Sequence, residues 1–256
     1  MSLIEVSCVT KKFEGLVANE DISFSVETGQ ILAIIGPNGA GKTTMFNMIS
    51  GFFKPTEGRI IFDSHDTTSL KPYTIASLGI VRTFQTIRIF PQLSVLENTL
   101  IGAHSQARSS WLEAIIRSTR QRREERQAIE RAMAELEFMG LSKRKDDLAR
   151  NLPYADQRRL EIARAMAGNP KLLLLDEPAA GMNPQESLQL RDTIRKLVDR
   201  GKTILLIEHH MRVVMGISDH IVVLDHGRKI AEGTPKEIQN NPAVIEAYLG
   251  VKASGH

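Results

Sequence analysis

The sequence lacks the features that mark disulfide-bonded, membrane-spanning or exported chains. It holds one cysteine in 256 residues, Cys8, which excludes an internal disulfide and fits a reducing compartment. No apolar run approaches the ~18 residues that cross a bilayer, and the longest are residues 31–35 and 172–175. Residues 1–6, MSLIEV, have neither a cationic start nor a long apolar stretch, so no secretory signal is expected.

The overall composition is that of an ordinary globular chain. Hydrophobic residues make up 42% and charged residues 25%, which excludes a disordered chain, a collagen-like chain and a coiled-coil rod. The length fits one large domain or two small ones. No internal repeat or low-complexity segment is present.

The formal net charge of +3 has a local origin. Residues 117–126, RSTRQRREER, hold five Arg and two Glu, so the charges elsewhere in the chain cancel. A solvated helix surface is one interpretation of this stretch. Attraction to anionic lipid headgroups is the alternative. Because the excess is confined to Arg117–Arg126, we expect no nucleic-acid partner.

Hydrophobic patterning predicts an α/β core. Residues 31–35, 172–175 and 203–207 are short apolar runs separated by helical patterns, as in buried parallel strands. Residues 221–224 predict another strand, which a tight turn at 225–227 connects to residues 228–231.

Two further regions are expected beside this core. Residues 3–9 and 22–26 predict antiparallel strands beside the main sheet. Residues 60–62, like residues 221–224, predict a further strand. From about residue 95 to residue 147 the strand patterns stop. Residues 128–139 space their apolar positions as an amphipathic helix does, which indicates a helical insertion. A short helix is expected after Thr234-Pro235.

A phosphate-binding loop follows the first core strand. Residues 36–43, GPNGAGKT, fit G-x-x-x-x-G-K-T, with a strand before and a helical pattern after. The glycines let backbone N–H groups turn inward toward an anion. Lys42 is expected to reach the β- and γ-phosphates, and the Thr43 hydroxyl to bind Mg²⁺. The predicted nucleotide-binding residues are Gly36, Pro37, Asn38, Gly39, Ala40, Gly41, Lys42, Thr43 and Thr44.

Two acids end the apolar run at 172–175. Ligands bind at the carboxyl edge of open α/β sheets, so Asp176 is expected near Mg²⁺. Glu177 is expected to polarise the water that attacks the γ-phosphate. The N-K-x-D motif expected of a GTPase is absent, so ATP is the predicted nucleotide.

Further segments fall in the order found in ABC-type ATPases, and the chain resembles that family from end to end. The resemblance makes Gln85 the Q-loop glutamine, which meets Mg²⁺, and His209 the switch histidine. It places Phe13 against adenine. It identifies residues 152–165 with the family signature and its helix. The implied signature residues, which act on the nucleotide of a second subunit, are Leu152, Pro153, Tyr154, Ala155, Asp156 and Gln157; the implied D-loop is Ala180, Gly181, Met182 and Asn183.

Simpler interpretations of three residue types remain open. Phe13 also fits a core position on an edge strand. Gln85 also fits an ordinary loop glutamine. The histidines at 209, 210, 220 and 226 match no compact metal-ligand spacing and no cysteine accompanies them, so we favour a hydrogen-bonded His209 near the γ-phosphate.

The resemblance implies a P-loop NTPase fold with an antiparallel β subdomain and an inserted α-helical subdomain. The expected boundaries are 1–86 and 160–256 for the catalytic core with its β subdomain, 87–159 for the helical subdomain with the signature, and 235–250 for a C-terminal helix. The closing Asn241-Pro242…Tyr248-Leu249-Gly250 and the segments 81–85, 160–165, 176–181 and 207–209 resemble the ATP-binding subunits of branched-chain amino-acid importers, in particular the larger of their two ATPase subunits.

This resemblance implies the partners. They are a second ABC ATPase subunit, in a heterodimer or a homodimer, two membrane permease subunits, and an external amino-acid-binding protein that acts indirectly. The chain itself is then expected to be peripheral, at the cytoplasmic face of the inner (plasma) membrane. The segment 86–91 is expected to receive a coupling element of a permease. A soluble ABC ATPase acting on nucleic acid or ribosomes is the alternative, which tandem cassettes or a long coiled-coil insertion would favour.

The signature departs from the family pattern L-S-G-G-Q. Pro153 lacks the serine hydroxyl and an N–H donor. Ala155 replaces a glycine, which would cause strain if that position needs a positive φ. Asn183 stands where many members carry a D-loop aspartate. We therefore expect that a composite site using this signature is the weaker of two unequal sites.

Overall fold

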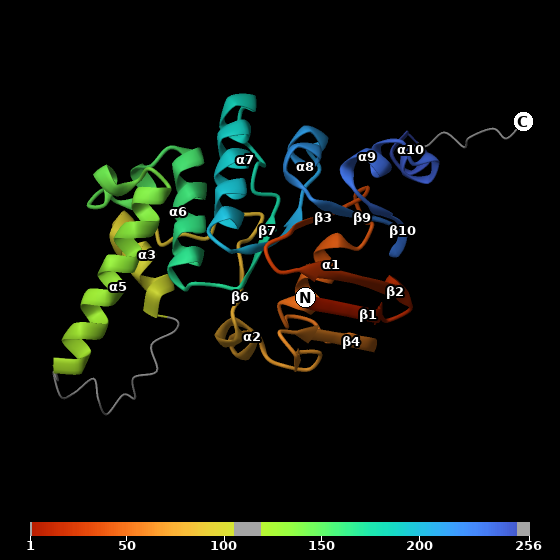
Figure 1. Cartoon of the computed structure of the whole chain (residues 1–256), viewed down its shortest axis with the longest axis horizontal. Helices are drawn as coiled ribbons and strands as arrows, with labels where there is room; N and C mark the ends of the chain where they lie inside the picture. Colours follow the sequence, from red (N-terminus) through yellow and green to blue (C-terminus); the bar gives the residue numbers. More distant parts are fainter. Residues whose placement is uncertain (1, 105–118, 250–256) are drawn as a thin grey trace, which may run out of the picture. The chain divides into compact units, whose positions relative to one another are not determined.

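The computed structural model describes residues 2–104 and 119–249, which form two compact units (Figure 1). Unit 1 comprises residues 1–82 and 171–256, and unit 2 comprises residues 83–170. The predicted boundaries at 86/87 and 159/160 differ from these, because residues 83–86 and the whole signature helix pack within unit 2. Residues 105–118 and 250–256 lie outside the described residues, as does Met1.

Unit 1 contains two sheets. The strand order of the larger is β10-β9-β3-β8-β7-β6. Strands β9, β3, β8, β7 and β6 pair in parallel, and β10 pairs with β9 in antiparallel fashion. The bounds are β3 (Ile31–Ile35), β6 (Ile80–Arg82), β7 (Leu172–Asp176), β8 (Thr203–Ile207), β9 (His220–Asp225) and β10 (Arg228–Gly233). The α/β core predicted from the apolar runs is confirmed, although β6 was not predicted as a strand.

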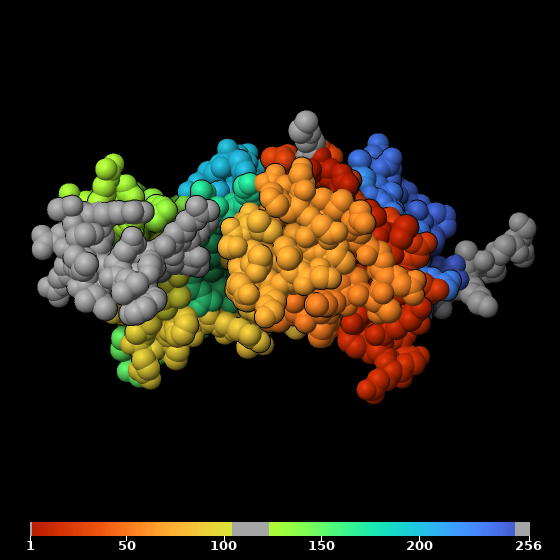
Figure 2. Space-filling view, turned by 90° about the horizontal axis from the view of Figure 1, so that it is seen from below, coloured from red at the N-terminus to blue at the C-terminus, as the bar shows by residue number. Residues whose placement is uncertain are grey.

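The second sheet is antiparallel, with strand order β2-β1-β4-β5. Its strands are β1 (Ser2–Phe13), β2 (Leu16–Glu27), β4 (Glu57–Phe62) and β5 (His65–Asp66). One buried hydrophobic cluster joins both sheets to helix α1 (Lys42–Ile49). In Figure 2 the stretch from β4 to helix α2 (Pro72–Leu78), coloured orange, covers one face of the unit.

Helices α7 (Pro184–Asp199), α8 (Met211–Ile217), α9 (Pro235–Gln239) and α10 (Pro242–Leu249) complete unit 1. The single helix predicted over 235–250 was therefore wrong: two helices occupy this stretch. Pro242 cannot continue an α-helix that precedes it, and the Asn241 side chain begins a new one by accepting a hydrogen bond from the Ala243 N–H at 2.9 Å.

In the described part of unit 2, the helices are α3 (Val95–His104), α5 (Thr119–Phe138) and α6 (Tyr154–Ala167), with the short 3₁₀ turns η1 (Ser142–Arg144) and η2 (Ala149–Asn151). The three helices pack against one another. A Cβ at Gly102 would lie 1.8 Å from the Arg164 carbonyl oxygen, so α3 and α6 approach closely only because this residue is glycine.

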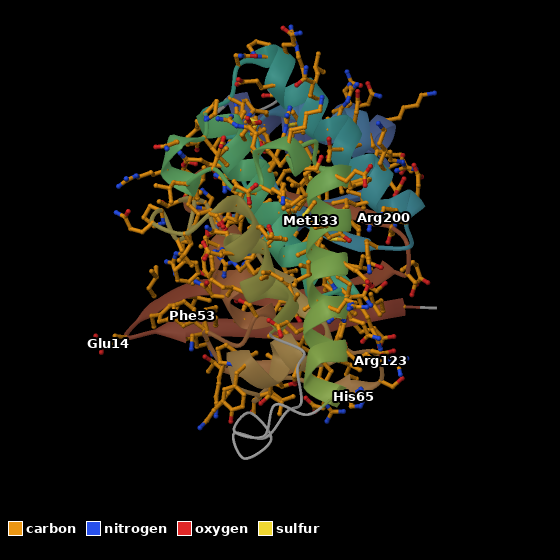
Figure 3. The ribbon with its side chains drawn as sticks, turned by 90° about the vertical axis from the view of Figure 1, so that its left-hand side faces the viewer. Glu14, Phe53, His65, Arg123, Met133 and Arg200 are labelled. Atoms are coloured by element: carbon orange, nitrogen blue, oxygen red, sulfur yellow. The ribbon has the colours of Figure 1, made fainter. Side chains whose placement is uncertain are left out.

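The basic stretch 117–126 is described only in part, because residues 117 and 118 lie outside the described residues. Arg123 and Arg126 have exposed side chains on α5, and Arg123 is labelled in Figure 3. Among the described residues, no helix is long and apolar enough to cross a membrane.

Candidate active site

The loop after β3 has the backbone of a phosphate cradle. Gly36, Gly39 and Gly41 have φ values of 149°, 83° and 95°, a range that favours glycine. A Cβ at Gly36 would lie 2.0 Å from the Leu224 carbonyl oxygen on β9, so the loop is seated against the sheet. Helix α1 begins directly after it at Lys42, which turns its first N–H groups toward the loop.

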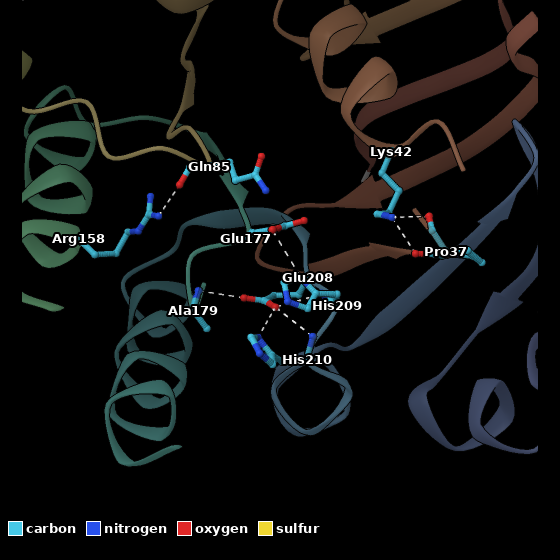
Figure 4. A network of polar contacts seen from close by, with 10 residues as sticks. Pro37, Lys42, Gln85, Arg158, Glu177, Ala179, Glu208, His209 and His210 are labelled. Atoms are coloured by element: carbon cyan, nitrogen blue, oxygen red, sulfur yellow. Dashed lines mark hydrogen bonds and ion pairs between the residues drawn. The ribbon is translucent and has the colours of Figure 1, made fainter. Parts of the chain in front are cut away.

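Lys42 is buried within this loop. Its ammonium group donates to the carbonyl oxygens of Gly36 at 2.7 Å and Pro37 at 2.8 Å (Figure 4), and the residue is only 8% exposed. Burial lowers the pKa of Lys42, and the nearby carboxylates of Glu177 and Asp176 oppose that shift. A desolvated cation among inward-facing N–H groups fits a polyphosphate anion.

Asn19 on β2 supports the loop and was not predicted from the sequence. Its buried side-chain amide donates to the Gly41 carbonyl oxygen at 3.2 Å. Thr43 is exposed in the first turn of α1 and Thr44 is partly buried beside it. The loop is thus held from β2 and from β9 while Thr43 stays accessible.

Asp176 ends β7, as predicted, but it already has a cationic partner. Arg82 at the end of β6 donates to Asp176 Oδ2 at 2.7 Å and to Asn47 Oδ1 at 2.6 Å. Both members of the ion pair are almost fully buried. Arg82 therefore fixes one carboxylate oxygen of Asp176, a role that the sequence analysis did not assign.

Glu177 occupies a turn immediately after β7. Its φ of 46° is unusual for a residue with a side chain, and such backbone conformations occur most often at functional sites. Its backbone N–H donates to the Ile207 carbonyl oxygen at 2.9 Å. His209 Nδ1 lies 3.5 Å from Glu177 Oε2, so the predicted base and the predicted switch histidine lie together (Figure 4).

Glu208 lies between β8 and His209 and connects the loop after β7 to the loop after β8. It is fully buried, and its Oε1 accepts the Ala179 N–H at 2.9 Å. Its Oε2 accepts the backbone N–H groups of His209 at 3.0 Å and His210 at 3.1 Å. One carboxylate thus connects the loop that carries Glu177 to the loop that carries His209. Nothing in the sequence pattern distinguished Glu208 from an ordinary loop acid.

The structure brings Glu208, His209 and His210 together, with one donor atom of each within 4.8 Å of the others. The sequence spacing had not indicated such a group. Both oxygens of Glu208 already accept N–H donors, and His210 Nδ1 lies 3.2 Å from Oε2. The arrangement is a hydrogen-bonded cluster that orients the loop.

The predicted D-loop leads into α7. Asn183 Oδ1 accepts the Glu186 N–H, and Glu186 Oε2 accepts the Asn183 N–H, both at 2.9 Å. This reciprocal pair is a capping box. Asparagine and aspartate cap helices about equally well, so replacing the family aspartate by Asn183 preserves the start of the helix. Ala180, Gly181 and Met182 form the turn before it.

Phe13 lies at the end of β1 and is 36% exposed, which removes the interpretation of a buried core residue. Its ring contacts Phe53 edge to face, with centroids 5.2 Å apart. The Lys11 ammonium lies 4.8 Å from the centroid of the Phe13 ring. An exposed, supported aromatic ring is suited to stacking on a planar base.

Gln85 and the signature segment belong to unit 2. The Gln85 side chain is exposed, and the backbone carbonyl oxygen of Gln85 accepts from Arg158 Nη2 at 2.7 Å. Pro153 is the N-cap of α6, and Tyr154 begins the helix with an exposed ring. Gln157 turns inward, where its side-chain amide donates to the Leu152 carbonyl oxygen at 2.9 Å.

Ala155 carries no backbone strain. It lies inside α6 and is not among the residues with positive φ, so the condition under which its side chain would cause strain is not met. Asp156 pairs with Arg144 at 3.2 Å and with Arg159 at 3.3 Å. These arginines offset the negative charge that Asp156 brings to the first turn of α6.

A family model described as ABC transporter matches residues 19–180, which include the phosphate loop, both carboxylates and the signature. This chain belongs to the ABC transporter family. As a cassette of that family it is an ATPase coupled to transport. A second model, Branched-chain amino acid ATP-binding cassette transporter, matches residues 228–254.

Individual relatives agree with the family. The cassette is 46% identical over 249 residues to the high-affinity branched-chain amino acid transport ATP-binding protein BraF of Pseudomonas aeruginosa, covering 97% of this chain and 98% of that protein. It is also similar to the crystal structure of the ADP conformation of an ATP-binding cassette of an ABC transporter, with a TM-score of 0.85, 35% identity, and coverage of 98% of this chain and 100% of that one.

A second similar structure is dimeric. It is a post-hydrolysis state of an ATP-binding cassette bound to ADP and Pi, with a TM-score of 0.75, 26% identity, and coverage of 91% of this chain and 98% of that one. The phosphate-loop motif and its geometry in this cassette agree with the ADP that these two similar structures contain.

The C-terminal helix of the cassette reaches the phosphate loop. A cavity of about 640 Å³ is lined by loop residues and by α10, including Asn38, Gly39, Asp225 and Glu246. Burial raises the pKa of Tyr248 on α10, and the Gly36 N–H opposes that shift. The stretch matched by the branched-chain family model therefore contacts the nucleotide-binding loop directly.

Glu208→Gln is expected to lower turnover by about 10- to 100-fold, because a small displacement of Glu177 and His209 misaligns the catalytic groups. It is also expected to lower the free energy of unfolding by about 1–3 kcal/mol, because an amide cannot accept N–H donors at both of its ends. Urea unfolding and steady-state ATPase assays measure the two effects. Glu232→Gln is the matched control, since Glu232 Oε1 lies 3.3 Å from His220 Nε2 at a partly exposed site. Equal turnover in both variants would contradict the positioning role.

Proposed function

We propose that this cassette hydrolyses ATP to power a membrane importer of branched-chain amino acids. The observation that carries the proposal is the convergence of the Lys42 cradle, the Asp176 and Glu177 carboxylates and His209 in unit 1. The similarity to BraF and the match of residues 228–254 support the substrate class.

Each candidate site residue of unit 1 that is named here has a proposed role in the reaction. Lys42 and the backbone N–H groups of the loop 36–44, all of whose residues except Pro37 have one, bind the β- and γ-phosphates of ATP. Glu177 takes a proton from the attacking water as general base. His209, beside Glu177, orients that water and the γ-phosphate. Phe13 stacks on adenine.

The donor set also fits Mg²⁺, which favours oxygen ligands and keeps several waters. The Thr43 hydroxyl is exposed and Asp176 Oδ1 lies on the carboxylate whose Oδ2 Arg82 fixes. We propose that Thr43 and, through water, Asp176 hold the ion; the resemblance to the family adds Gln85, which belongs to unit 2. Bound Mg²⁺ supplies charge neutralisation at the phosphate oxygens.

The importer requires a second ATPase subunit, which follows from having one phosphate loop and one signature in the chain. We propose that residues 152–157 close over the nucleotide of that subunit, with the helix N-terminus at Tyr154 facing the γ-phosphate. Two permease subunits and an external binding protein complete the assembly. The cassette is then peripheral, at the cytoplasmic face of the inner membrane.

Reconstitution tests the proposal. The cassette, its paired ATPase and candidate permeases are placed in proteoliposomes, with the binding protein added inside or outside. We expect leucine, isoleucine or valine on the binding-protein side to stimulate ATP hydrolysis and to be transported. Stimulation by nucleic acid or ribosomes, and none by any amino acid, would support the alternative function and overturn this one.

Pro153→Ser is expected to raise the ATPase rate of the full complex by about two- to fivefold, because a hydroxyl at the helix N-cap adds one donor toward the γ-phosphate. Ala155→Gly alone is expected to leave the rate unchanged, because Ala155 already has helical backbone. Assaying each variant alone in proteoliposomes distinguishes the effects of the two substitutions on the ATPase rate. An unchanged rate with Pro153→Ser contradicts the idea that this signature forms the weaker site.

A further inference from the structure

Arg158 and Glu161 form a buried ion pair on α6, directly after the signature segment. Arg158 Nη1 donates to Glu161 Oε2 at 2.8 Å, and the two side chains are 0% and 1% exposed. Burying a charged pair costs desolvation energy that often equals the attraction gained. Stability alone therefore does not account for this pair.

Both members of the pair also hold the backbone that follows β6. Arg158 Nη1 donates to the Phe84 carbonyl oxygen and Nη2 to the Gln85 carbonyl oxygen, each at 2.7 Å. Glu161 Oε1 accepts the Arg88 N–H at 3.1 Å. Figure 4 shows the bond from Arg158 to Gln85. Three charge-assisted hydrogen bonds thus fasten residues 84–88 to the first two turns of α6.

Glu161 extends the connection toward Phe90. Burial lowers the pKa of Arg164, one turn further along α6, and the Glu161 carboxylate opposes that shift. The Arg164 guanidinium lies 5.7 Å from the centroid of the exposed Phe90 ring. Arg88 lies likewise 4.0 Å from the Phe84 ring centroid. The segment 84–90 therefore follows α6 along both its backbone and its aromatic side chains.

We propose that Arg158 and Glu161 are positioning residues that make the segment 84–88 and the signature helix move as one body. A displacement of that segment then reaches residues 152–157 without being absorbed by the intervening loop, because the guanidinium fork fixes two carbonyl groups in a plane. This proposal rests on the proposed function, together with the expectation from the resemblance that residues 86–91 receive a coupling element of a permease subunit.

Amide hydrogen exchange of the isolated cassette tests the connection itself. The paired variant Arg158→Met with Glu161→Leu removes both charges at similar volume, so no lone charge stays buried. We expect exchange at residues 84–88 to accelerate by about tenfold or more, with the rest of unit 2 unchanged. Arg150→Met is the matched control, since Arg150 also bonds a nearby residue, Gln92 at 3.0 Å, but at the surface. Exchange equal to wild type overturns the proposal.

Reconstituted complexes test the consequence. We expect the basal ATPase rate of the isolated paired variant to stay within about twofold of wild type. In proteoliposomes, we expect its stimulation by amino acids to be at least about fivefold weaker than that of wild type. Full stimulation overturns the proposal. A wild-type complex without stimulation overturns the proposed function instead, and the exchange experiment still decides the role of the ion pair.

A single, nearly isosteric substitution tests the proposal if the paired variant fails to fold. Glu161→Gln keeps the side-chain shape and an acceptor for the Arg88 N–H, but loses the charge that orients Arg158. We expect exchange at residues 84–85 to accelerate by about threefold and exchange at Arg88 to change less. No acceleration at either position overturns the proposal.

Discussion

Glu177→Gln is expected to bind ATP about as tightly as the wild-type cassette and to hydrolyse it about 10²–10⁴-fold more slowly. Glutamine is nearly isosteric with glutamate, so the turn at φ 46° and the approach of His209 are preserved. The amide cannot accept a proton from water, which removes the general base and leaves the phosphate cradle intact.

Single-turnover ATPase assays and fluorescent-nucleotide titration separate these two effects. Glu5→Gln is the matched control, because Glu5 is an exposed acid on β1 in the same unit. A variant that binds ATP but turns over at a rate near that of the control would remove Glu177 from its role as base. Loss of binding together with turnover would assign Glu177 to nucleotide binding.

Gly36→Ala is expected to abolish measurable ATP binding and to lower the free energy of unfolding by about 2–5 kcal/mol. The residue has φ 149°, and its new Cβ would lie 2.0 Å from the Leu224 carbonyl oxygen. The Cβ is attached directly to the backbone of the phosphate loop, and the Leu224 carbonyl oxygen belongs to the backbone of the central sheet. Neither atom can therefore move without displacing the Lys42 cradle.

Gly15→Ala is the matched control for this substitution. Gly15 has φ 96°, but no atom lies within 4 Å of a Cβ built there, so only backbone strain remains. We expect a loss of about 1–2 kcal/mol and normal ATP binding. Thermal unfolding with and without ATP measures both variants, at about 2–4 °C per kcal/mol for a chain of this size. Equal losses in the two variants would show that the contact with Leu224 contributes nothing.

The elements that sequence patterns predicted best are those specified by adjacent residues. The runs at 31–35, 172–175 and 203–207 became β3, β7 and β8, since a continuous apolar run can only be buried on both faces. The glycines of the phosphate loop were predictable because their positive φ values exclude most other residues. Strand β6 was missed, because three residues carry too short a pattern.

The residues that support the site but were not predicted from the sequence have hydrogen-bond partners far away in the chain. Asn19 supports Gly41 from 22 residues away, Glu208 holds Ala179 from 29, and Arg82 holds Asp176 from 94. Each looks like an ordinary polar residue in its own segment. Ala155 is a related case: whether its side chain causes strain depends on a backbone angle that only the start of α6 defines.

The sequence by itself determined the chemistry of this cassette, because a phosphate loop, a strand-ending acid pair and a histidine are recognisable from spacing within single segments. Only the tertiary structure decided how those groups are held. The parallel pairing of β7 with β8 sets Asp176 opposite Ile207, so Glu177, which follows β7, emerges beside Glu208 and His209, which follow β8. Register between strands is a property of the whole sheet, and no single segment specifies it.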